Sequence, residues 1–163
     1  MEITLHAATP DESESIRQIQ EAAFAPLLER YRDFDGSPAM ETAESIRERF
    51  NIPGFAFYFI RLSEHTIGSM RIRDIGDGTC WLGKIDILPQ YQGFGYAQHA
   101  IRLAESLYPH VKRWGLTTIK QEAKLRYLYE KMGYKLTGWE ENIKDGMDLI
   151  RYSKDKNERN NEL

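Results

Sequence analysis

The sequence lacks the features that mark disulfide-rich, secreted or membrane-spanning chains. Cys80 is the one cysteine in 163 residues, so no disulfide can form within the chain and nothing indicates an oxidising compartment. No apolar run approaches the roughly 20 residues of a membrane-spanning helix. The N-terminal residues also lack the basic start and apolar run of a signal peptide. We therefore expect a cytoplasmic protein without a membrane partner.

A large excess of charge of either sign is missing as well. The chain has 22 basic and 25 acidic residues, with a net charge of −3. Proteins that bind duplex DNA usually present a basic face, so we expect no nucleic-acid partner. The four histidines show no metal-ligand spacing, and we expect no metal. An apolar fraction of 41% is typical of a globular chain of this length.

Hydrophobic periodicity predicts a single domain in which helices and strands alternate in the order β-α-α-β-β-β-α-β-α-β-β. Hairpins in the first half and one later β-α-β unit predict a mixed α/β sheet. We expect the domain to span residues 1–153, followed by a polar and disordered tail at 154–163. The expected strands are 2–6, 55–62, 69–73, 79–88, 116–119, 134–140 and 147–152, and the expected helices are 10–26, 40–50, 97–107 and 125–132. Pro26 limits or kinks the first helix, and 27–38 is predicted to be irregular.

The segment after the fourth strand carries the most informative motif. That strand ends at Pro89, and Gly93 and Gly95 open the next helix. The first turn of a helix has N–H groups without intrahelical partners and about half a positive charge. Glycines remove the Cβ atoms that would hold an anion away from those groups. The turn therefore predicts a diphosphate site, although a tight turn that serves helix packing has the same pattern.

Two other phosphate-binding patterns do not fit this turn. A P-loop needs a lysine, and none lies between Lys84 and Lys112. A dinucleotide fingerprint needs a small residue where the chain has Gln98, and an acidic residue at the end of the next strand. A nucleotide-dependent oxidoreductase is therefore disfavoured.

What does fit is Gln-x-x-Gly-x-Ala, with Gln92, Gly95 and Ala97. It resembles the acetyl-coenzyme A motif of the GNAT superfamily of N-acetyltransferases. About 35 residues later, Tyr129 and Gly133-Tyr134 resemble the Tyr-x-x-x-Gly-Phe/Tyr ending of that domain. With the matching element order, the resemblance extends to about Tyr152.

The resemblance implies an acetyltransferase that uses acetyl-coenzyme A as co-substrate. The fourth and fifth strands would splay apart to admit the pantetheine, which pairs with the backbone near Ile85 and Ile87. Tyr129 would lie near the coenzyme sulfur. The pKa of a phenol, near 10, is above the pKa of a thiol, near 8.5, so a hydrogen bond to the departing thiolate is easier than complete proton transfer. The backbone amides that would hold the pyrophosphate belong to Gln92, Gly93, Phe94, Gly95, Tyr96 and Ala97.

The chain departs from the family pattern at one position and has no obvious general base. Many relatives have an asparagine early in the helix after the fifth strand, where this chain has Leu125 or Glu122. Asp86, close to the expected thioester, is the first candidate base, and Glu122 is the second. Asp86 could instead face solvent or pair with Lys84, and Glu122 could serve the helix dipole.

The acceptor pocket of the family is usually built from the first two helices and the last hairpin. Carboxylates gathered there would suit a cationic amine, although surface acids are mostly solvated. The sequence thus predicts transfer of an acetyl group to a primary amine of a small molecule or peptide. A non-catalytic acyl-coenzyme A sensor stays open as the alternative, and so does a homodimer. The pocket residues in this chain would be Tyr31, Asp33, Asp35, Glu140 and Glu141.

Overall fold

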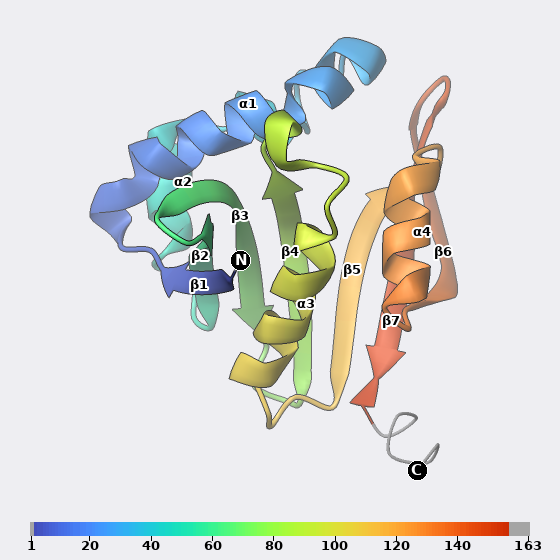
Figure 1. Cartoon of the computed structure of the whole chain (residues 1–163). Coiled ribbons are helices and arrows are strands. Elements are labelled where there is room, and N and C mark those ends of the chain that lie inside the picture. The colour runs from blue at the N-terminus through green and yellow to red at the C-terminus, as the bar shows by residue number, and fades with distance from the viewer. Residues whose placement is uncertain (1, 157–163) are drawn as a thin grey trace.

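The computed structural model of the chain describes residues 2–156, which form one mixed sheet flanked by helices (Figure 1). The order of the main helices and strands is the predicted one. The strands are β1 Ile3–Ala7, β2 Phe55–Leu62, β3 His65–Asp74, β4 Thr79–Ile87, β5 Arg113–Ile119, β6 Lys135–Lys144 and β7 Met147–Asp155. The helices are α1 Ser13–Tyr31, α2 Ala43–Arg49, α3 Tyr96–Leu107 and α4 Ala123–Lys131, with 3-10 turns η1 Pro10–Glu12, η2 Pro38–Met40 and η3 Pro89–Tyr91.

The strands lie in the order β1-β2-β3-β4-β5-β7-β6. The pair β4–β5 is parallel, and the other five neighbouring pairs are antiparallel. This arrangement follows from the connections, because tight turns join antiparallel neighbours, whereas α3 provides the long crossover that a parallel pair requires. The predicted mixed sheet is confirmed.

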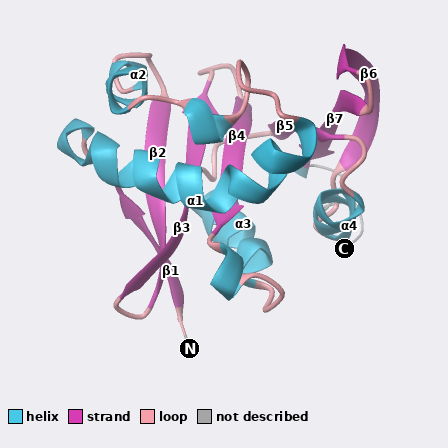
Figure 2. Cartoon of the chain, turned by 90° about the horizontal axis from the view of Figure 1, so that it is seen from above, coloured by secondary structure: helices cyan, strands magenta, loops and turns pink. Residues whose placement is uncertain are grey.

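Helices cover both faces of the sheet, as Figure 2 shows from above. On one face, Ala100 and Ile101 of α3 and Tyr129 of α4 belong to the larger apolar core. On the other face, Ile16 of α1 and Ile46 of α2 pack against phenylalanines of β2. None of the helices within residues 2–156 has the length and hydropathy that a membrane span requires.

A bulge at Gly83 changes which face the side chains of β4 point to. Leu82 pairs with Ile72, but Lys84 pairs with Arg71, so one extra residue lies between them. Leu82 therefore joins the core under α3. Lys84 points to the opposite face, which α1 and α2 cover, and the residues after it keep this reversed alternation.

Several boundaries differ from the predicted ones by a few residues, among them the ends of α1 and β7. Helix α1 continues through Pro26 to Tyr31, so residues 27–31 are helical rather than irregular. Pro26 and Ala22 are both exposed, and water can therefore satisfy the carbonyl that proline leaves without a donor. Strand β7 continues to Asp155, past the boundary predicted at 153. The rest of the predicted tail, 157–163, lies outside the described residues.

Candidate active site

Strands β4 and β5 pair only at the beginning of their length. Thr79, Cys80 and Trp81 are matched with residues 113–115 of β5, and the pairing ends there. Strand β3 pairs with β4 as far as Ile87, and β7 pairs with β5 as far as Ile119. The two strands therefore diverge after Trp81, as predicted, and leave the edge of β4 from residue 82 onward free of strand pairing. We call the opening between these diverging edges the slot.

The glycine turn follows β4 directly. Gly93 and Gly95 have φ angles of +87° and +82°, which glycine adopts without strain. The side-chain nitrogen of Gln92 donates to the carbonyl of Ile87 over 2.8 Å and so fixes the turn to the end of β4. A Cβ atom on either glycine would meet no protein atom within 4 Å. Backbone conformation, rather than close helix packing, is therefore what requires glycine here.

Consecutive backbone N–H groups of this turn have no acceptor. Within residues 2–156, the N–H groups of 93–98 form no hydrogen bond, whereas that of Gln92 donates to Pro89 and that of His99 donates to Gly95. They lie at the N-terminus of α3, a helix of 12 residues, where the dipole adds positive charge. Unpaired donors at a helix N-terminus suit an anion. The residues present therefore fit a diphosphate. The N–H of Gln92, which the predicted set includes, donates to Pro89, and its contact with a diphosphate stays a prediction.

Tyr129 lies on α4 among aromatic side chains. It is 6% exposed, and its ring lies 6.3 Å from that of Tyr134 and 6.1 Å from that of Tyr152, measured between centroids. Within the described part of the chain, its hydroxyl has no hydrogen-bond partner. Burial raises the pKa of Tyr129 well above its ordinary value. The hydroxyl therefore stays protonated and has its hydrogen free to donate.

The slot, the glycine turn and the buried Tyr129 agree with the protein family that the sequence matches. The model of the acetyltransferase (GNAT) family matches residues 14–134. The chain belongs to the GNAT family. No curated protein matches it.

Solved structures share the GNAT fold with this chain at low sequence identity. A chimera of the Vibrio cholerae spermidine N-acetyltransferase SpeG and hSSAT has a TM-score of 0.77 and 19% identity over 99% of both chains. PaiA N-acetyltransferase from Thermoplasma acidophilum, in complex with coenzyme A, has a TM-score of 0.66 and 17% identity over 95% of this chain and 99% of that one. The Salmonella typhimurium acetyltransferase that modifies the N-terminal serine of ribosomal protein L7/L12 has a TM-score of 0.75 and 12% identity, with 94% of each chain covered.

Asp86 is held in a buried cluster. One carboxylate oxygen accepts the Ser69 N–H at 2.9 Å, and the other accepts the Ser69 hydroxyl at 2.9 Å and the Lys84 ammonium at 2.6 Å. The side chains of Lys84 and Asp86 are 3% and 2% exposed. Burial lowers the pKa of Lys84, and the charge of Asp86 opposes that shift. Asp86 therefore pairs with Lys84 and does not face solvent.

Glu122 lies at the start of α4 and connects it to α1. Its Oε2 accepts a hydrogen bond from the Arg30 guanidinium at 2.6 Å and another from the Tyr31 hydroxyl. Burial, and then the hydrogen bond to Glu122, raises the pKa of Tyr31. The structure thus brings together a predicted base and a predicted acceptor residue. No sequence pattern points to Arg30, because it lies 92 positions from Glu122 and no local motif links them.

Of the other predicted acceptor residues, Asp33 and Asp35 follow the end of α1, whereas Glu140 and Glu141 are neighbours on β6. Asp33 accepts a hydrogen bond from the N–H of Gly36 in its own turn at 3.3 Å. Glu140 pairs with Lys120 at 2.9 Å. Asp35 and Glu141 are exposed. The role of these residues in acceptor binding stays a prediction.

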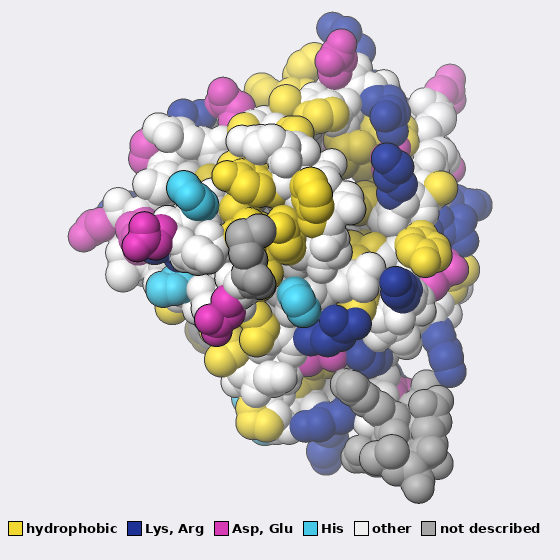
Figure 3. All heavy atoms as spheres, viewed as in Figure 1, with side chains coloured by type: hydrophobic (Ala, Val, Ile, Leu, Met, Phe, Trp, Pro, Cys, Tyr) yellow, Lys and Arg dark blue, Asp and Glu magenta, His cyan; other side chains and the backbone are white. Residues whose placement is uncertain are grey.

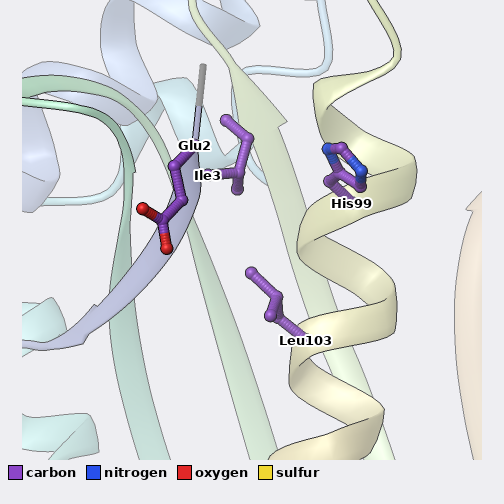
Figure 4. Close-up of a pocket in the computed structure, with 4 residues that line it drawn as sticks. All are labelled: Glu2, Ile3, His99 and Leu103. Atoms are coloured by element: carbon purple, nitrogen blue, oxygen red, sulfur yellow. The ribbon is translucent and has the colours of Figure 1, made fainter.

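A separate hollow of about 420 Å³ lies between the start of β1 and α3, lined by Glu2, Ile3, His99 and Leu103 (Figure 4). It is on the side of α3 away from β5 (Figure 1) and does not belong to the slot.

On the face shown in Figure 3, Lys and Arg side chains gather over and beside α4, which is favourable for an anionic ligand approaching the slot.

Proposed function

We propose that this chain transfers an acetyl group from acetyl-coenzyme A to a primary amine of a small molecule or peptide. The observation that carries the proposal is the run of unpaired N–H groups at 93–98, placed directly beyond the end of β4. Membership of the GNAT family supports it, as does the coenzyme A complex of PaiA, which has the same fold. A cytoplasmic location belongs to the same proposal.

The unpaired donors and the free edge of β4 would hold different parts of the coenzyme. The N–H groups from Gly93 to Ala97 bind the diphosphate. The backbone of Ile85 and Ile87, on the stretch of β4 that has left β5, pairs with the pantetheine amides. The acetyl thioester then lies in the slot and is open to attack by an amine.

Tyr129 assists departure of the thiolate in this proposal. The amine nitrogen forms a bond to the thioester carbon, the carbon–sulfur bond breaks, and its electron pair stays on sulfur. Because burial raises the pKa of Tyr129, the hydroxyl donates a hydrogen bond to the developing thiolate and keeps its proton. A hydrogen bond that strengthens in the transition state lowers the barrier.

The incoming ammonium must lose a proton, and of the two candidate bases Glu122 is the more accessible. Asp86 uses both carboxylate oxygens in a cluster that is almost fully buried. Glu122 is 12% exposed, and both of its hydrogen bonds go to Oε2. Its Oε1 can therefore accept the proton from the ammonium and release it to solvent. We propose Glu122 as the base, acting directly or through water.

The alternative is a non-catalytic acyl-coenzyme A sensor. It is favoured by the fact that both candidate bases already have cationic partners, Lys84 and Arg30. Such a protein binds the coenzyme but does not turn it over.

Two measurements on the whole protein separate these proposals. Calorimetry with coenzyme A tests binding, and thiol release from acetyl-coenzyme A tests transfer to spermidine, free amino acids and short peptides. Saturable binding with thiol release is the expected result. Binding without release from any amine would favour the sensor, and the absence of binding would contradict both.

A further inference from the structure

Arg151 of β7 lies against two tryptophans from other strands. Its guanidinium carbon is 3.8 Å from the ring centroid of Trp139 on β6 and 5.4 Å from that of Trp81 on β4. Contacts of this kind are attractive, because the face of an indole ring carries negative charge. We call these three side chains the arginine stack.

Gly115 of β5 allows the arginine stack to form. A Cβ atom built on it would lie 2.9 to 3.1 Å from three atoms of the Trp81 ring. The indole of Trp81 therefore lies on the backbone of β5, and Arg151 comes from the next strand beyond. The φ angle of Gly115 is not positive, so the need for glycine comes from this packing.

The guanidinium of Arg151 lacks a carboxylate partner. Within residues 2–156 it forms no ion pair, and its Nε atom is buried without an acceptor. By contrast, Glu41 holds both Arg49 and Arg71. When a guanidinium stacks on an aromatic ring, its N–H groups point outward in the plane of the guanidinium and can still donate to another partner. That geometry matches a carboxylate, which accepts two parallel N–H bonds.

The arginine stack lies on the face of the sheet opposite Tyr129. Tyr152 contacts Tyr129, and its neighbour Arg151 points to the other face because side chains alternate along a strand. Arg151 pairs with Thr117, two positions beyond the last residue of β5 that pairs with β4. It therefore lies at the level where the slot opens. Helices α1 and α2 pack on β2, β3 and β4 of this face, whereas Thr117 is exposed.

We propose that Arg151, held between Trp81 and Trp139, binds a carboxylate of the acceptor. The acceptor class is then an amine that also carries a carboxylate, such as an amino acid or a peptide. This inference rests on the proposed acetyl transfer, in which the coenzyme sulfur lies on the Tyr129 side and the amine arrives from the other face. The pairing of Glu140 with Lys120 and of Glu122 with Arg30 agrees with it, because a cationic partner weakens the attraction of an acid for a polycation.

The test compares matched acceptors with and without the carboxylate, and rates are expressed per concentration of unprotonated amine, because amidation lowers the pKa of a nearby amine. Thiol release from acetyl-coenzyme A is measured with amino acids and dipeptides, each as the free acid and as the C-terminal amide. For the wild type we expect a lower KM for the acids. Arg151→Gln should lower kcat/KM for the acids by about ten- to hundredfold, because a hydrogen bond to a charged group is lost, and should leave the amides almost unchanged. Arg151→Lys should restore part of the preference, since it keeps the charge but not the planar pair of donors.

Arg102→Gln is the matched control, since Arg102 is an exposed arginine on α3, which covers the other face of the sheet, and it should leave the preference intact. Thermal unfolding and calorimetry with coenzyme A show whether each variant is folded and binds the coenzyme. Equal use of acids and amides by the wild type would overturn the carboxylate site but leave acetyl transfer standing. So would an equal loss for both in Arg151→Gln. Absence of thiol release from every acceptor would instead reject the proposed function, and the carboxylate site with it.

Discussion

The Tyr31 hydroxyl donates a hydrogen bond to the carboxylate of Glu122, and this contact joins the end of α1 to the start of α4. These helices belong to opposite halves of the sheet, which diverge at the slot. Tyr31→Phe should therefore reduce the free energy of unfolding by about 1 kcal/mol, as measured by urea denaturation. Arg30→Gln removes a mostly exposed partner of the same carboxylate and should have a smaller effect. Equal effects of the two variants would show that the phenol contributes nothing beyond the exposed ion pair.

Tyr129→Phe should lower turnover without weakening coenzyme binding. Loss of a hydrogen bond to a developing charge reduces kcat by roughly a hundredfold, whereas the Kd for coenzyme A should stay the same. Because burial raises the pKa of Tyr129, the wild-type rate should not fall between pH 8 and about 10 through loss of the Tyr129 proton. Unchanged kcat in Tyr129→Phe would contradict the assignment, whereas a decrease in that range that disappears in the variant would contradict only the raised pKa. Tyr127→Phe, on the exposed side of α4, is the control.

Lys84→Met should destabilise the protein by about 3–5 kcal/mol, because it leaves the Asp86 carboxylate buried without a counter-charge. The double variant Lys84→Met/Asp86→Asn should regain about 2 kcal/mol of that loss. It contains neither charge of the Lys84–Asp86 pair, and the amide oxygen can still accept the Ser69 N–H. Chemical denaturation of both variants measures the difference. A double variant no more stable than Lys84→Met would show that the ion pair is not the source of the effect.

Local chemistry explains why the glycine turn could be predicted from the sequence. Gly93 and Gly95 have the positive φ angles that the turn requires, and Gln92 fixes the turn to β4 through a contact five residues away. The splay of β4 and β5 was implied by family resemblance, and their limited pairing confirms it.

The surroundings of the candidate bases could not be predicted in full, because they depend on distant contacts. Lys84 and Asp86 share one strand face, but the bulge at Gly83 decides which layer covers that face. The bonds from α1 to Glu122 exist because α1 continues past Pro26, where the sequence predicts that the helix is limited or kinked. No sequence pattern anticipated the arginine stack, whose members come from three strands joined through the fold.

Glu41→Gln tests the ion pairs beneath α2. Burial raises the pKa of Glu41, but the nearby charges of Arg71 and Arg49 outweigh that effect and leave the pKa below its usual value. Its stabilising contribution is therefore complete above the unfolded-state pKa of about 4.3 and is lost as the pH falls through the lower folded-state value. Unfolding at pH 7 should show a loss of about 3 kcal/mol for the variant, and the difference from wild type should shrink below pH 4. The exposed Glu48→Gln should show neither effect; a difference that is constant with pH would contradict the ion-pair explanation.

Gly95→Ala and Gly146→Ala separate backbone strain from loss of the diphosphate site. The φ angles of the two glycines are +82° and +81°, and a Cβ atom on either would meet no protein atom within 4 Å. Both variants should therefore lose a similar 1–2 kcal/mol of stability, which is the cost of a left-handed conformation for alanine. Only Gly95→Ala adds a methyl group beside the unpaired N–H groups, so only this variant should weaken coenzyme A binding, by at least tenfold in calorimetry. Unchanged affinity in Gly95→Ala, with the stability loss present, would mean that the diphosphate binds elsewhere.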